Sequence, residues 1–231
     1  MYSPEQQTFI ELVRHFNLVP VYRTIIADLD TPLTLFAKIA GEDSHAFLFE
    51  SMEGGEKWGR YSFIGFDPLL VFTSVRDQVE IRFPEHAGKD ELRSGVQPLD
   101  ELRRLLASFV VPDTPGPARF YGGAVGFLGY DMVRFMEHLP DRHPVSALPD
   151  SSFLIPRMVL IHDAVQQKLT IVCNVRAQNP EDAVHLYADA CQRIDAVVDR
   201  LQQPIDRRRI VQKESVIPHR FTANMDEAAF K

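Results

Sequence analysis

The chain has 231 residues, of which 45% are apolar and 25% are charged, a composition typical of globular proteins that bury a core. The formal net charge is -7 and the basic residues are dispersed except at Arg207, Arg208 and Arg209, which argues against nucleic acid or an anionic membrane as a partner. The amino terminus lacks a signal-peptide pattern, and no run reaches the roughly 20 apolar residues of a membrane span, so we expect a cytoplasmic protein.

The first 51 residues predict two helices and two strands. Ser3 as N-cap, followed by Pro4 at the first helical position, indicates a first helix. The β-branched residues 21–27 indicate a strand. Thr31-Pro32 predicts a short helix that ends before Gly41, and residues 45–51 (HAFLFES) are again strand-like.

A group of three short strands follows, separated by Asp67-Pro68 and Arg76-Asp77. The expected strands are residues 60–65, 68–75 and 78–83. Their close spacing predicts an antiparallel meander, and polar residues 84–95 predict a loop after it. A helix is then expected from Pro98, with Leu99, Leu102, Leu106 and Phe109 facing inward.

Four glycines occur among apolar residues in 120–137, without the GxGxxG spacing of a phosphate cradle. They indicate close packing of backbone against backbone. After a loop at 140–149, residues 152–163 and 168–175 predict a hairpin, and Asn179 predicts the start of a long amphipathic helix. The side chains expected on its buried face are Leu186, Ala190, Ile194, Val197 and Leu201.

Strands and helices therefore come in uneven groups, which predicts an α+β fold with mainly antiparallel sheets and flanking helices. At the carboxyl end, Asn224 and Glu227 form a capping-box pattern just before the chain stops at Lys231. One interpretation is a frayed tail. The other is that residues 1–223 form an amino-terminal domain and residues 224–231 begin a helix of a longer protein.

Sequence patterns of known catalytic sites are scarce. GxSxG, HExxH and P-loop patterns do not occur, and the histidines have no spacing suited to a metal, so we assign no catalytic residue and no metal ligand. Cys173 and Cys191 lack CxxC spacing, which predicts buried free thiols.

Glu50 and Ser51 end a strand and precede Gly54-Gly55. One interpretation is a simple turn in which Glu50 faces water. The other is a small-molecule site in which the carboxylate takes an ammonium group and the hydroxyl takes a carboxylate or amide, with Lys57 and Arg60 as nearby cations. The residue types alone leave both interpretations open.

Two stretches carry a family resemblance. FLFESMEGGEKWGRYSFIGFDP (47–68) resembles the LLES, EGGE and GRYSFIG signature of anthranilate synthase component I, and YGGAVGFLGYD (121–131) resembles its GGxxGYxxYD signature. The closing FTANMDEAAFK resembles the start of the family's chorismate-utilising half. The resemblance implies the amino-terminal half of that fold, in an enzyme that converts chorismate and ammonia or glutamine to anthranilate and pyruvate.

The resemblance also implies roles for particular residues. Ser51 would bind the inhibitor L-tryptophan with Glu50 beside it, although Leu48-Phe49 replace the leucines of LLES. Magnesium and the catalytic groups would belong to the carboxyl-terminal half, so we expect this chain alone to be inactive. A glutamine amidotransferase subunit, component II, is the expected partner.

Two alternatives remain at this stage. Aminodeoxychorismate synthase component I shares the fold and can retain a tryptophan-binding motif. A non-catalytic module that senses an amino acid is the alternative from another functional class.

Overall fold

The structure is a computed structural model that describes residues 1–40, 45–52, 58–85, 88–113, 120–139, 148–205 and residue 228. For residues 51, 52 and 58 only the backbone is described. The helix start expected at 224–231 lies outside the described residues except for Ala228.

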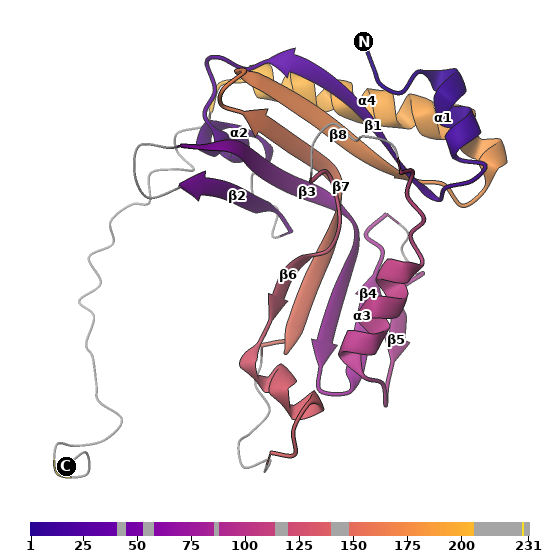
Figure 1. Cartoon of the computed structure of the whole chain (residues 1–231), viewed down its shortest axis with the longest axis vertical. Helices are drawn as coiled ribbons and strands as arrows, with labels where there is room; N and C mark the ends of the chain where they lie inside the picture. Colours follow the sequence, from indigo (N-terminus) through magenta and orange to yellow (C-terminus); the bar gives the residue numbers. More distant parts are fainter. Residues whose placement is uncertain are drawn as a thin grey trace.

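The described residues form one antiparallel sheet with helices packed on it, as the α+β prediction required (Figure 1). The helices are α1 (Gln6–Leu12), α2 (Pro32–Ile39), α3 (Pro98–Ala107) and α4 (Ala183–Gln202), with short 3-10 helices η1 (Tyr130–Phe135) and η2 (Pro180–Asp182). The strands are β1 (Leu18–Ile26), β2 (Phe47–Met52), β3 (Trp58–Val75), β4 (Gln78–Arg82), β5 (Glu91–Arg93), β6 (Val125–Leu128), β7 (Ser151–Asp163) and β8 (Lys168–Arg176).

The strand order is β1-β8-β7-β3-β4-β5, while β2 pairs with β3 and β6 pairs with β7. The long strands β3 and β7 run side by side through both ends of the curled sheet, as Figure 1 shows. Helices α1, α2 and α4 lie at the end that contains β1 and β8, and α3 lies at the end that contains β4 and β5. The β7–β8 hairpin confirms the prediction for residues 152–175.

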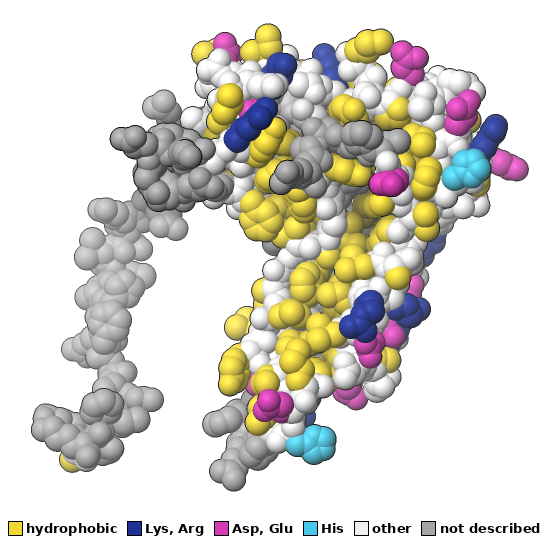
Figure 2. All heavy atoms as spheres, in the orientation of Figure 1, with side chains coloured by type: hydrophobic (Ala, Val, Ile, Leu, Met, Phe, Trp, Pro, Cys, Tyr) yellow, Lys and Arg dark blue, Asp and Glu magenta, His cyan; other side chains and the backbone are white. Residues whose placement is uncertain are grey.

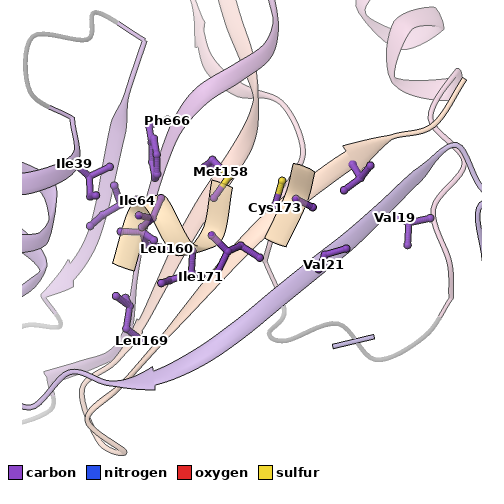
Figure 3. Packing of buried hydrophobic residues seen from close by; sticks show 14 of the residues in the cluster. Val19, Val21, Ile39, Ile64, Phe66, Met158, Leu160, Leu169, Ile171 and Cys173 are labelled. Carbon is purple, nitrogen blue, oxygen red and sulfur yellow. The ribbon is translucent and has the colours of Figure 1, made fainter. Parts of the chain in front are cut away.

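The main core lies between the sheet and the helices α1, α2 and α4. Figure 3 shows part of it, with Ile39 of α2 near side chains of β1, β3, β7 and β8. Alternate residues of β7 and β8, such as Leu160 and Ile171, point into it and are fully buried. A second cluster, which includes Leu70, Phe72 and Ile81, packs at the other end of the sheet under α3. Because side chains alternate along a strand, Val159 and Ile161 lie on the opposite face of the sheet from Leu160.

The predicted N-cap residue forms the cap at the start of α2 but not at the start of α1. Thr31 caps α2 as predicted, since its side chain accepts a hydrogen bond of 3.2 Å from the Thr34 amide. The predicted role of Ser3 is wrong, because Ser3 is extended and exchanges backbone hydrogen bonds of 2.9 and 2.8 Å with Tyr22. Helix α1 therefore starts at Gln6, with Glu5 as N-cap.

The predicted break at Asp67-Pro68 is also wrong. Residues 58–75 form the single 18-residue strand β3, in which the register against β7 shifts between Pro68 and Leu70. Proline cannot donate to the ladder, and Asp67 adopts φ 48°, so the irregularity is absorbed as a bulge rather than a chain reversal. The loop expected at 84–95 contains β5, which pairs with β4.

The prediction that Leu106 of α3 faces inward is wrong, whereas the prediction for the glycine segment is confirmed. Leu106 is 39% exposed, whereas Leu105 joins Leu102 and Phe109 against the second cluster. The close packing predicted for the glycines is confirmed at Gly126, where a Cβ atom would lie 1.9 Å from the backbone oxygen of Ser152.

The long helix α4 follows η2, and its predicted buried face is confirmed, with Leu186 only partly buried. Both cysteines are free thiols. Cys173 is buried, and this burial raises the pKa of its thiol to about 12, whereas Cys191 is only partly buried. Within the described ranges, every helix is too short or too polar to traverse a lipid bilayer.

Candidate ligand-binding site

Glu50 lies near the end of β2, the strand on which the sequence places the candidate site. Within the part of the chain that the structure describes, β2 pairs with β3 alone, with Glu50 opposite Ser62 and Phe49 opposite Phe63. The register then shifts between Glu50 and Met52. Glu50 is exposed, so its carboxylate is available to a ligand at this rim.

Aromatic side chains gather beside Glu50. The ring centroid of Phe47 lies 4.8 Å from that of Phe49, and the ring of Phe120 lies 5.2 Å from that of Phe63. These separations are typical of favourable aromatic pairs. Phe47 can approach β3 because residue 65 is glycine, where a Cβ atom would lie 2.1 Å from the Phe47 ring.

The aromatic cluster borders a hollow of about 400 Å³. Its lining residues are Leu48, Phe49, Glu50, Tyr61, Phe63 and Phe120. Phe49 is 49% exposed and Tyr61 is 37% exposed, so a ligand can reach their rings. The rings form a flat apolar surface that suits an aromatic or other apolar ligand group. Glu50 also lines the hollow, but because side chains alternate along β2 its side chain starts on the opposite face from that of Phe49.

Ser51 follows Glu50 in β2, and the structure describes its backbone only. The structure therefore places Glu50 at the hollow and leaves the predicted contact of the Ser51 hydroxyl untested. The aromatic lining residues were not named as site residues from the sequence. Their signal was the alternation of aromatic side chains at 47 and 49 and at 61 and 63, which puts each pair on one face of its strand.

Of the two expected cations, Arg60 lies beside the hollow, with its guanidinium carbon 4.8 Å from the ring centroid of Tyr61. Lys57 lies outside the described residues. Arg60 also forms an ion pair with Asp163, with 2.7 Å between Nη2 and Oδ2. The hydrogen bond from Arg60 holds the pKa of the Asp163 carboxyl below its ordinary value, although burial acts in the opposite direction. Arg60 is therefore a cation near the hollow, as expected, and its charge is paired with Asp163.

Metal-binding residues do not cluster in the described ranges. Within them, His, Cys, Asp and Glu side chains form no group of three or more that could hold a metal ion.

Known proteins resemble this chain over most of its length. The chain is 36% identical over 199 residues to anthranilate synthase component 1 of Acetivibrio thermocellus, which covers 85% of the chain. It is 33% identical over 211 residues to the protein of that name from Acinetobacter calcoaceticus and 35% identical over 209 residues to the one from Synechocystis. The chain is homologous to anthranilate synthase component 1.

The homology covers only part of each relative. The chain spans 39% of the Acetivibrio anthranilate synthase component 1 and 40% of the other two. No family model matches the chain. Anthranilate synthase component I of Streptococcus pneumoniae is similar in structure over 79% of this chain and 37% of its own, with a TM-score of 0.49 and 20% sequence identity.

Proposed function

We propose that this chain is the amino-terminal part of an enzyme that forms anthranilate and pyruvate from chorismate and ammonia or glutamine. The observation that carries the proposal is the identity of 33–36% to curated relatives named anthranilate synthase component 1. Because the chain spans about 40% of those relatives, we assign the catalytic groups and a magnesium ion to the remaining part. A glutamine amidotransferase subunit is the proposed source of ammonia.

The product distinguishes this enzyme from aminodeoxychorismate synthase. The full chain, supplied with chorismate, magnesium and ammonia, is expected to release fluorescent anthranilate together with an equal amount of pyruvate. Accumulation of aminodeoxychorismate without pyruvate would instead assign the enzyme to the other reaction. A full chain that binds an amino acid but consumes no chorismate would support a sensing module.

The proposed role of the described residues is feedback inhibition by L-tryptophan. Glu50 takes the ammonium group of the inhibitor, and the Ser51 hydroxyl takes its carboxylate. The aromatic hollow supports this assignment, since Phe49, Tyr61 and Phe63 offer apolar surface for an indole beside an exposed carboxylate. The rest of the pocket is assigned to the remaining part of the enzyme.

Ser51→Ala and Glu50→Gln in the full chain test this site. A hydrogen bond to a charged group contributes roughly 1.5–3 kcal/mol, and about 1.4 kcal/mol corresponds to a tenfold change in affinity. Each variant should therefore raise the tryptophan concentration for half-inhibition by roughly ten- to a hundredfold. Each value is measured against the uninhibited rate of the same variant, so that a change in turnover is not counted.

Glu11→Gln is the matched control, because Glu11 is an exposed carboxylate on α1. It should leave the tryptophan response unchanged. A Ser51→Ala enzyme with the sensitivity of the unmodified protein would refute the role of the hydroxyl, and the interpretation of Glu50 and Ser51 as a simple turn would then be preferred.

A further inference from the structure

Arg176 lies over two aromatic rings at the end of β8. Its guanidinium carbon lies 5.5 Å from the ring centroid of Phe83 and 5.4 Å from that of Phe109. Phe83 follows β4 and Phe109 follows α3, so three separate elements fix the position of this side chain. Stacking on aromatic faces leaves the N–H groups at the edge of a guanidinium available to bind an acceptor.

The guanidinium of Arg176 has no carboxylate of the described residues within ion-pair distance. Every other arginine in the described ranges either lies within 4.0 Å of a carboxylate or is exposed. Arg176 is partly buried, and burial lowers the pKa of its guanidinium while the more distant charge of Glu91 acts in the opposite direction. Burying a cation without a counter-ion raises the free energy of the folded protein, so binding of an anion at Arg176 would be favourable.

A cavity of about 250 Å³ adjoins this side chain. Arg176 lines it together with Phe83, Leu69, Gln178 and Asn179. Gln178 and Asn179 each carry an amide that can donate hydrogen bonds. The volume is below the roughly 300–1,000 Å³ that is usual for drug-sized ligands, so the cavity suits a small molecule.

Acidic residues also line the cavity, and two of them are already paired. Glu85 lies 2.6 Å from both Arg157 and Arg193, and Asp189 lies 2.7 Å from Arg193. Their charges are compensated and do not oppose a ligand carboxylate at Arg176. Asp182 differs, since it is exposed and accepts only a long hydrogen bond of 3.4 Å from Asn179 among the contacts of the described residues.

We propose that this cavity binds the carboxylate group of a small ligand and that Arg176 is its anchor. Arginine and carboxylate form two parallel hydrogen bonds, which fix orientation as well as charge. The carboxylate can belong to a simple organic acid or to a small amino acid, whose ammonium group would face Asp182. This site is separate from the hollow beside Glu50, so it does not depend on the function proposed above.

The test compares solutes on the full chain by calorimetry and thermal unfolding. Sodium acetate supplies a carboxylate alone, L-alanine supplies a carboxylate with an ammonium group, and sodium chloride at equal ionic strength is the reference. Acetate or alanine should bind and raise the Tm above that in chloride. Arg176→Met should weaken this binding about tenfold or more, because the charged hydrogen bonds are lost.

Arg200→Met is the matched control, because Arg200 is exposed on α4, and it should bind as the unmodified chain does. If Arg176→Met does not fold, Arg176→Lys is used instead. Lysine keeps the positive charge but cannot form the two parallel hydrogen bonds of a guanidinium, so this variant should still bind acetate or alanine more weakly than the unmodified chain. Tighter binding of alanine that Asp182→Asn abolishes would identify an amino acid as the ligand. Equal binding by the unmodified and Arg176 variants, or no binding of either solute, would overturn the proposal.

Discussion

At the scale of single residues, Asp163 at the end of β7 binds both the β7–β8 turn and Arg60 of β3. Asp163 accepts hydrogen bonds of 3.0 Å from the amides of Val165 and Gln166 and a bond of 2.7 Å from Arg60 Nη2. The carboxylate is thus bound to the turn and to β3 at once. Its pKa lies below the ordinary value, because the bond from Arg60 outweighs the opposing effect of burial.

This shift sets a pH dependence with a definite sign. A carboxyl whose pKa is lower in the folded state stabilises the fold above its unfolded pKa, near 3.9, and loses that contribution as pH falls through its folded pKa. Arg60→Gln should therefore be less stable than the unmodified protein at pH 7. The difference should shrink below about pH 4.

Urea unfolding at a series of pH values measures this effect, with Arg14→Gln as the control because Arg14 is exposed. The control should track the unmodified protein throughout. A stability difference for Arg60→Gln that stays constant from pH 7 to pH 3 would show that the ion pair does not set the behaviour of Asp163.

The partner of Arg60 illustrates why sequence patterns miss such contacts. Asp163 lies 103 residues further along the chain, and only the pairing of β3 with β7 brings the two side chains together. Glu50, in contrast, was proposed as a site residue from its place at a strand end, and it lines the hollow.

At the scale of elements, the bulge in β3 is tied to the rest of the fold by charges. Asp67 lies 3.3 Å from Arg157 on β7 and 3.2 Å from Arg193 on α4. The same two arginines each lie 2.6 Å from Glu85, just after β4. This network joins the main core to the end of the sheet that carries β4 and β5, at the residue where β3 bends.

Asp67→Asn tests how much this network stabilises the bulge. Asparagine tolerates the positive φ of 48°, so the substitution removes charge without adding backbone strain. Both arginines are mostly buried, and a loss of about 1–3 kcal/mol in the free energy of unfolding is expected. Chemical denaturation supplies the measurement.

Asp131→Asn is the comparison, because Asp131 forms a more exposed pair with Arg134 within η1. Such surface pairs contribute about 0–1 kcal/mol. Equal costs for the two substitutions would mean that the network around Asp67 is no stronger than a surface ion pair.

The elements that the sequence predicted well are those with local signals. Helix α2 carries its own cap at Thr31, and the apolar spacing of α4 from Ala190 to Leu201 sets its buried face. The errors arose where distant pairing overrides local signals. Asp67-Pro68 has the composition of a turn, yet pairing with β7 on both sides keeps β3 continuous, and Ser3 pairs with β1 instead of capping a helix.

At the scale of the whole molecule, the two faces of the sheet differ. Helices α1, α2 and α4 pack over one face and bury the main core. On the other face Val159, Ile161 and Val172 form a small cluster with Phe63 and Tyr22 against it. Figure 2 shows hydrophobic side chains gathered along this hollowed inner face, in a band that follows the long strands.

This inner face leads to a prediction for the 231 residues as an isolated protein. Monomers rarely expose continuous apolar patches larger than a few hundred Å², and larger patches are sites of association. The isolated chain should therefore bind a hydrophobic dye, and its average mass by light scattering should rise with concentration. Phe49→Ser should reduce both signals because Phe49 belongs to the aromatic group on this face, whereas Val184→Ser, a substitution of a 51% exposed residue on α4, should not. A constant monomer mass over a wide concentration range, without dye binding, would show that the inner face needs no partner.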